Sequence, residues 1–60
     1  MGARILVAED DQKQAELIRI YLERDGHHVL VAADGRTALT WCRSRRPDLL
    51  VLDIMMPGMD

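Results

Sequence analysis

Three short runs of aliphatic residues stand out along the chain, and polar or turn-forming residues bound each of them. They cover residues 4–8, 28–32 and 49–52. Runs of this length that are rich in Val, Ile and Leu and end at turn signals are typical of strands. The last run, Leu49-Leu50-Val51-Leu52, is uninterrupted, which predicts a parallel strand buried on both faces.

Two segments with helical spacing separate these runs. In the first, Asp11 is the expected N-cap with Gln14 at the capping-box position, and Gly26 is the expected left-handed residue after the helix. In the second, Asp34 is the expected N-cap, and Pro47 prevents continuation of a helix over residues 37–44. The expected apolar sides are Ala15, Ile18 and Leu22, with Leu17 and Tyr21 beside them, and then Ala38, Leu39 and Cys42.

The alternation of strands and helices predicts an α/β fold with right-handed crossovers and a parallel sheet. If the first strand lies between the other two, the carboxyl ends of the first and third are adjacent. Glu9, Asp10 and Asp53 follow those two strands, so they are expected to converge in a crevice at the topological switch point.

Three converging carboxylates repel one another, and a hard divalent cation is the natural compensation. Mg²⁺ binds through one or two carboxylates and keeps several waters or phosphate oxygens. An aspartate can also act as a nucleophile and form an aspartyl phosphate. These residues are therefore consistent with metal-assisted phosphoryl transfer in which Asp53 is the nucleophile.

Length and charge narrow the classes of protein. The chain has 60 residues, a net charge of −2 and one cysteine, Cys42. This argues against a nucleic-acid-binding surface in the segment and against a disulfide framework or a zinc cluster. No apolar run has the length of a membrane span, so an intracellular, cytoplasmic protein is expected. A chain this short has a marginal core, which indicates part of something larger.

Some of these residues also have simpler explanations. Asp11 is well placed to act only as a helix cap, and the adjacent His27 and His28 are expected at the surface, because neighbouring strand residues point to opposite faces. Cys42 and Trp41 are expected to pack rather than to react. The spacing of the acids argues against a calcium loop, and an aspartyl-phosphate hydrolase would need an Asp where Met55 stands.

Several short motifs follow one another along the chain, namely Ile5-Leu6-Val7-Ala8-Glu9-Asp10-Asp11, Gly26-His27-His28-Val29, Ala33-Asp34-Gly35, Ala38-Leu39 and Pro47 to Asp60. This ordered set resembles the receiver domain of two-component response regulators, most closely the winged-helix transcription-factor branch. The resemblance covers nearly the whole chain, and it is the spacing of the set that is specific.

The resemblance implies a role for individual residues. Asp53 matches the phosphoacceptor, which a sensor histidine kinase would phosphorylate. Asp10 would bind Mg²⁺ directly, and Glu9 directly or through a water. The backbone carbonyl of Met55 would be a further metal ligand. Pro57 and Gly58 would shape the neighbouring loop.

The resemblance also implies the fold and its extent. The expected fold is a flavodoxin-like doubly wound sheet, of which residues 1–60 hold three strands in the order 2-1-3 and two helices. The rest of the receiver domain, with its phosphate-binding Ser/Thr and Lys, and any output domain are expected to be absent. The third strand would then be an open apolar edge, and the first would lose cover on one face, so an isolated chain is expected to self-associate by swapping or edge pairing.

The expected function is that of a phosphoacceptor switch rather than an enzyme in the ordinary sense, although it assists its own phosphorylation and dephosphorylation. It would control transcription through a DNA-binding output domain elsewhere in the protein. The alternative is a pseudo-receiver, a protein–protein interaction module that is not phosphorylated.

Overall fold

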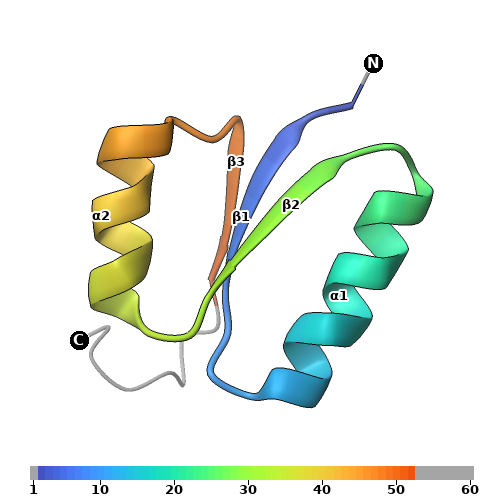
Figure 1. The fold of residues 1–60 in the computed structure, drawn as a ribbon, viewed down its shortest axis with the longest axis horizontal. Coiled ribbons are helices and arrows are strands. Elements are labelled where there is room, and N and C mark those ends of the chain that lie inside the picture. Colours follow the sequence, from blue (N-terminus) through green and yellow to red (C-terminus); the bar gives the residue numbers. More distant parts are fainter. Residues whose placement is uncertain (1, 53–60) are drawn as a thin grey trace.

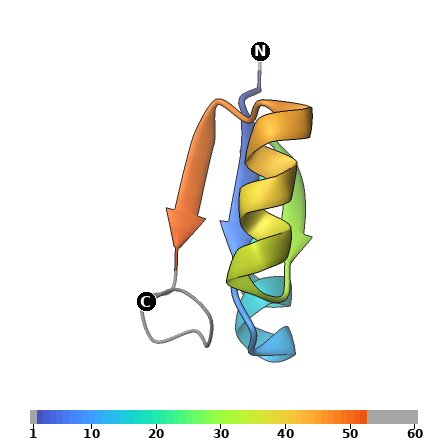
Figure 2. The same cartoon turned by 90° about the vertical axis from the view of Figure 1, so that its left-hand side faces the viewer.

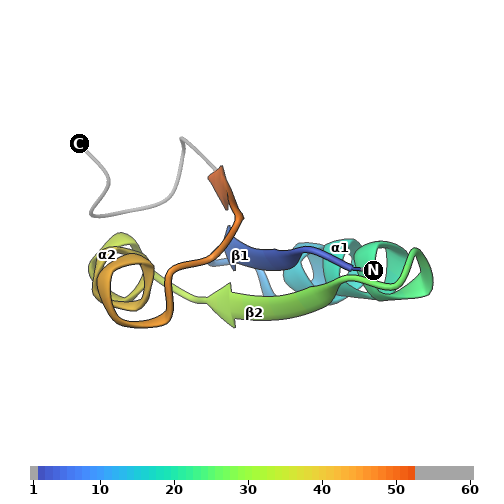
Figure 3. The same cartoon turned by 90° about the horizontal axis from the view of Figure 1, so that it is seen from above.

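The fold alternates strands and helices from one end to the other, as the hydrophobic pattern predicts. A computed structural model describes residues 2–52. The elements are β1 (Arg4–Ala8), α1 (Gln12–Arg24), β2 (His28–Ala32), α2 (Gly35–Arg45) and β3 (Leu49–Leu52). The strands form one parallel sheet in the order β2-β1-β3, with α1 and α2 on opposite faces (Figures 1 and 3). The predicted fold class and strand order are confirmed.

The register places β1 at the centre of the described sheet. Arg4 pairs with His28 and Ala8 with Ala32, while on the other side Ile5 pairs with Leu49 and Ala8 with Leu52. All strands run in the same direction, so both helices begin at the carboxyl edge of the sheet and return to its amino edge (Figures 1 and 2). Each loop that follows β1 or β2 therefore lies at the carboxyl edge.

The core is a small aliphatic cluster on the α2 face of the sheet. Leu6, Ala8, Ala32 and Ala38 are buried there. Around them pack the half-buried side chains of Leu30, Trp41, Cys42 and Leu50. On the opposite face Ile5, Val7 and Ala15 are buried. Cys42 and Trp41 thus pack against the core, as expected.

The apolar face of α2 differs from the expected one. Leu39 is 57% exposed, and Trp41 takes its place against the core. The reason is helical geometry: Ala38, Trp41 and Cys42 are separated by three and four residues and share a face, whereas Leu39 is turned by about 100° from Ala38. The assignment of Leu39 to the apolar side was therefore wrong. In α1, Leu17 and Tyr21 lie at the margin of the buried stripe and are 49% and 58% exposed.

Two expectations about the burial of strands are also corrected. Leu49 and Leu52 are 53% and 43% exposed, so β3 is not buried on both faces; among the described residues it is an edge strand with β1 on one side alone. In contrast, β1 loses no cover. Ile5 to Ala8 are all at most 4% exposed, because strands flank β1 on both sides and each face carries a helix.

The ends of the helices follow the sequence signals closely at α1. Asp25 is the C-cap, and Gly26 follows with φ of 89°. The N–H of Gly26 donates to the carbonyl of Glu23 and that of His27 to the carbonyl of Leu22, which is the Schellman arrangement. At the end of α2, by contrast, Arg46 takes the left-handed conformation with φ of 46°. Within residues 2–52, neither helix has the length and hydropathy needed to cross a bilayer.

Candidate functional site at the carboxyl edge of the sheet

Two acidic residues follow β1 directly at the carboxyl edge. The main chain of Glu9 extends the β1–β2 ladder by one bond, since its N–H donates to the carbonyl of Ala32 at 2.9 Å. Glu9 is half-buried and Asp10 is exposed. The sheet therefore fixes the backbone at this point and presents two consecutive carboxylates beyond it.

The end of β3 lies at the same edge, beside the end of β1. Ala8 and Leu52 are Cα partners in the parallel ladder. In the sequence, Glu9 follows Ala8 and Asp53 follows Leu52. The structure thus brings together the two strand ends from which the predicted site residues continue. Asp53, Met55, Pro57 and Gly58 themselves lie outside the described residues.

Asp11 caps α1, and Glu9 completes the cap. The Asp11 carboxylate accepts the N–H groups of Lys13 at 2.9 Å and Gln14 at 3.2 Å. A full capping box would have the Gln14 side chain accept the N–H of Asp11. That N–H donates instead to the Glu9 Oε2, at 3.2 Å. The predicted N-cap is confirmed. The second bond of the predicted capping box is wrong, because the side chain of Glu9, and not that of Gln14, accepts the N–H of Asp11.

Asp34 occupies the equivalent place after β2. Its carboxylate accepts the Thr37 N–H at 2.7 Å and caps α2, as predicted. The backbone N–H of Thr37, followed by the Thr37 side chain, holds the pKa of Asp34 below its ordinary value of 3.8. The capping bonds thus keep this exposed carboxylate ionised at the acidic edge.

The acids at the carboxyl edge differ in whether they bond to the start of a helix. Asp11 and Asp34 are N-caps, and Glu9 accepts one N–H at the start of α1. Asp10 accepts no hydrogen bond from residues 2–52 and caps neither helix. An exposed carboxylate that local structure does not use is available to a ligand.

The donor set suits a hard cation as far as the structure describes it. Glu9 and Asp10 offer carboxylate oxygens, the ligands that Mg²⁺ prefers, and one or two carboxylates suffice for Mg²⁺ when water and phosphate complete its shell. Residues 2–52 alone contain no group of three or more His, Cys, Asp or Glu side chains gathered for metal binding. The third predicted carboxylate, Asp53, lies beyond that range.

The histidines are separate from this edge. His27 is half-buried, and its Nδ1 accepts the N–H of Ala3 at 3.0 Å, while His28 is exposed at the start of β2. Both lie at the amino edge, so they share no site with Glu9 and Asp10. His28 instead belongs with Arg4 and Arg45 around a pocket that the sequence did not reveal.

Comparison of the sequence with known proteins identifies a family. Residues 5–60 match the model of the response regulator receiver domain. The chain is 48% identical over 60 residues to the DNA-binding response regulator MtrA of Mycolicibacterium paratuberculosis, covering all of this chain and 27% of that protein.

Two further relatives give the same picture. The alkaline phosphatase synthesis transcriptional regulatory protein PhoP of Bacillus subtilis is 42% identical over 60 residues, covering all of this chain and 25% of the relative. The transcriptional regulatory protein AfsQ1 of Streptomyces coelicolor is 45% identical over 56 residues, covering 93% of this chain and 25% of the relative. The chain therefore spans only a part of each relative's length. It belongs to the response regulator receiver domain family.

Proposed function

We propose that this domain is the phosphoacceptor switch of a two-component system, with Asp53 as the residue that receives the phosphoryl group. The observation that supports this most is the pairing of Ala8 with Leu52, because the acidic pair and Asp53 follow those two residues in the sequence. Membership of the receiver family supports the same assignment. The donor would be the phosphohistidine of a sensor kinase.

The transfer needs little covalent machinery from the protein. A carboxylate oxygen of Asp53 attacks phosphorus, the P–N bond of the phosphohistidine breaks as the P–O bond forms, and the imidazole leaves with the electron pair. The chain's part is positioning and charge, which dominate phosphoryl transfer. The ladder bond from Glu9 to Ala32 fixes the backbone that leads into the acidic pair.

We further propose Asp10 as the direct carboxylate ligand of Mg²⁺, Glu9 as a ligand directly or through a water, and the carbonyl of Met55 as a third contribution. The exposure of Asp10 and its lack of a structural role in residues 2–52 support this assignment. The bound cation would neutralise charge on the phosphoryl oxygens and on the crowded carboxylates.

The wider role follows from the relatives named as DNA-binding and transcriptional regulators. In this proposal phosphorylation at Asp53 controls an output domain elsewhere in the protein, in the cytoplasm, and DNA is contacted only by that domain. The receiver is a switch that assists its own phosphorylation and dephosphorylation rather than an enzyme acting on other substrates.

Self-association of the isolated 60-residue chain is a further part of the proposal. The exposed apolar side chains of Leu49 and Leu52 on an edge strand support it, since such strands invite pairing with another chain. Light scattering on the purified 60-residue chain should then give a mass above that of a monomer. A folded, monodisperse monomer would contradict this part alone.

The central test is the intact mass of the protein before and after treatment with acetyl phosphate and Mg²⁺. We expect a gain of one phosphoryl group, about 80 Da, that Asp53→Asn abolishes. Asp34→Asn is the matched control, because Asn retains a capping oxygen at another acid of the same edge. Phosphorylation that persists in Asp53→Asn would refute the assignment. A protein that binds Mg²⁺ but gains no mass would favour the pseudo-receiver.

Metal binding is tested separately by thermal unfolding with and without Mg²⁺. A ligand that binds only the folded state raises stability in proportion to the logarithm of its concentration. The rise should be lost in Asp10→Asn and kept in Asp34→Asn. Equal behaviour of the two variants would remove Asp10 from the site.

A further inference from the structure

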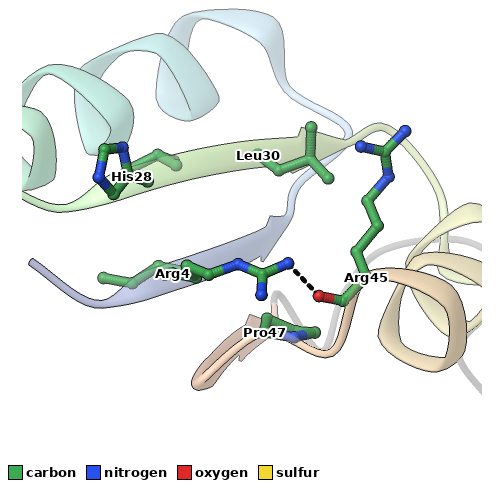
Figure 4. Close-up of a pocket in the computed structure, with 7 residues that line it drawn as sticks. Arg4, His28, Leu30, Arg45 and Pro47 are labelled. Atoms are coloured by element: carbon green, nitrogen blue, oxygen red, sulfur yellow. Dashed lines mark hydrogen bonds between the residues drawn. The ribbon is translucent and has the colours of Figure 1, made fainter.

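A pocket of about 180 Å³ opens at the amino edge of the sheet, at the other end of the strands from the acidic site. Figure 4 shows Arg4 on β1, His28 on β2, and Arg45 and Pro47 at the end of α2 around it. The remaining lining residues are the aliphatic Ile5, Val29 and Leu30. The pocket therefore joins an apolar wall with basic side chains from three separate elements.

The charge of the lining is of one sign. Two arginines and a histidine line the pocket, and no carboxylate of residues 2–52 does. Within residues 2–52 the sole salt bridge joins Glu16 and Arg19, so neither Arg4 nor Arg45 has an acidic partner there. Asp48 brings one negative charge close by, since its Oδ2 accepts the main-chain N–H of Arg4 at 2.8 Å. The charged side chains among the lining residues are therefore those of Arg4 and Arg45.

Both arginines are held in place by contacts that leave donors for a ligand. The Arg4 guanidinium donates to the carbonyl of Arg45 (Figure 4). The guanidinium carbon of Arg45 lies 5.4 Å from the centroid of the Trp41 ring. A guanidinium carries five N–H donors in a planar fork, so one bond to a carbonyl or one ring contact uses a small part of its capacity. Side chains that are already ordered lose less entropy on binding.

Size and polarity indicate the class of ligand. A cavity of about 150 Å³ accommodates benzene, whereas pockets for drug-sized molecules start near roughly 300 Å³. We propose that this pocket binds a small organic carboxylate whose apolar body is about the size of one ring. The carboxylate is bound by the arginines that line the pocket, and the body lies against Leu30 and Pro47. This proposal does not rest on the proposed phosphorylation at Asp53.

The test uses benzoate as the probe and neutral benzamide as its isostere, followed by amide chemical shifts of the isotope-labelled protein. Benzoate should shift the amides of Ile5, Val29 and Leu30 saturably, with a Kd on the order of 1 mM, and benzamide should bind at least about fivefold more weakly. Added NaCl should weaken benzoate binding, because exposed charges are screened. No shift of these amides up to roughly 20 mM benzoate, or equal binding of benzamide, would overturn the proposal.

A pair of charge-removing variants then locates the binding. Arg45→Gln should weaken benzoate about fivefold, while Arg43→Gln, an exposed arginine of the same helix that does not line the pocket, should change it less than about twofold. Circular dichroism checks that both variants are folded. Asp48→Asn keeps an acceptor for Arg4 and removes the nearby negative charge, so it should tighten binding. Equal weakening by Arg43→Gln and Arg45→Gln would show a diffuse charge effect and no site.

Discussion

The acids that cap the helices lie at the carboxyl edge of the sheet and the arginines that end α2 lie at the amino edge, and comparing the two edges shows which charges are structural. Asp11 and Asp34 stand at the N-termini of the helices, and Arg43 and Arg45 lie in the last turn of α2. These signs are the ones that the helix macrodipoles favour. Much of the opposition between the edges therefore follows from two helices that begin at one edge and end at the other.

What remains after the helix ends are accounted for differs between the edges. At the carboxyl edge the acid that caps no helix is Asp10. Glu9 accepts the N–H of Asp11 at the start of α1 and still has carboxylate capacity for a ligand. At the amino edge the remaining residues are Arg4 and His28, which line the pocket together with Arg45 from the end of α2. A charged residue is therefore a better indicator of function when it does not stabilise the end of a helix.

The largest effect is expected from a core substitution in β1, because unfolding the sheet abolishes the sites at both of its edges. Leu6 is the middle residue of β1 and is 1% exposed, so Leu6→Ala should cost about 2–5 kcal/mol of unfolding free energy. A domain of this size has little stability to lose, and the far-UV circular dichroism should show an unfolded or severely destabilised chain. Leu39→Ala makes the same change at a side chain that is 57% exposed and should have a small effect. Similar melting curves for the two variants would contradict the assigned core.

The next effect separates capping from ligand binding at the carboxyl edge. Asp11→Ala should cost about 1 kcal/mol, because two N–H groups at the start of α1 lose their acceptor. Asp10→Ala should change stability in metal-free buffer by less than about 0.5 kcal/mol, since Asp10 bonds to no residue in the described range. Urea unfolding of both variants measures the difference. Equal losses would mean that Asp10 has a structural role after all.

A smaller effect depends on pH and concerns Asp34. Its folded-state pKa lies below 3.8 because the Thr37 N–H donates to it, so the unfolded chain binds the proton more readily. The resulting stabilisation is present above the ordinary pKa and is lost as pH falls through the folded-state pKa. Asp34→Asn keeps the cap without the titration, so wild type should lose stability relative to this variant as pH falls below about 5 and through the folded-state pKa. Parallel pH profiles would contradict the capping assignment.

The smallest effect on stability is expected from an ion pair on α1 that lies away from both edges of the sheet. The Arg19 side chain bonds to Glu16 on the exposed face of α1 and lowers the pKa of that carboxyl. Exposed pairs of this kind contribute little to stability, so Glu16→Gln should shift the melting temperature by less than roughly 4 °C in differential scanning calorimetry. A larger shift would show that charges outside the edges also matter to the fold.

The sequence predicts the elements well because their signals are local. The bounds of β1, β2 and β3 follow the aliphatic runs, and Asp11, Gly26 and Asp34 mark helix ends by their own chemistry. The order of the strands follows from the rules for parallel crossovers. At the site, the positions of Glu9 and Asp10 after β1 are predicted in the same way, whereas Asp53 and Met55 lie outside the described residues.

What the sequence misses depends on three-dimensional context. The exposure of Leu49 and Leu52 depends on which strands lie beside β3, and the choice of Trp41 over Leu39 depends on how α2 is rotated against the sheet. Arg46 takes a left-handed conformation where neither Gly nor Asn marks the end of α2. The amino-edge pocket is invisible because Arg4, His28 and Arg45 are far apart in the chain and meet only through the strand register.

The central position of β1 has a consequence for the order in which the domain assembles. The bond between Ala3 and His27, the residues just before β1 and β2, joins positions 24 apart in the sequence, and the bond from Arg4 to Asp48 joins positions 44 apart. Because the entropy of closing a loop rises only logarithmically, nearly doubling the loop adds about 0.6 kcal/mol. During synthesis β1 can therefore pair with β2 while β3 is still unmade, and the late strand then docks at little extra entropic cost. The backbone that positions Glu9 and Asp10 would then be in place before Asp53 leaves the ribosome.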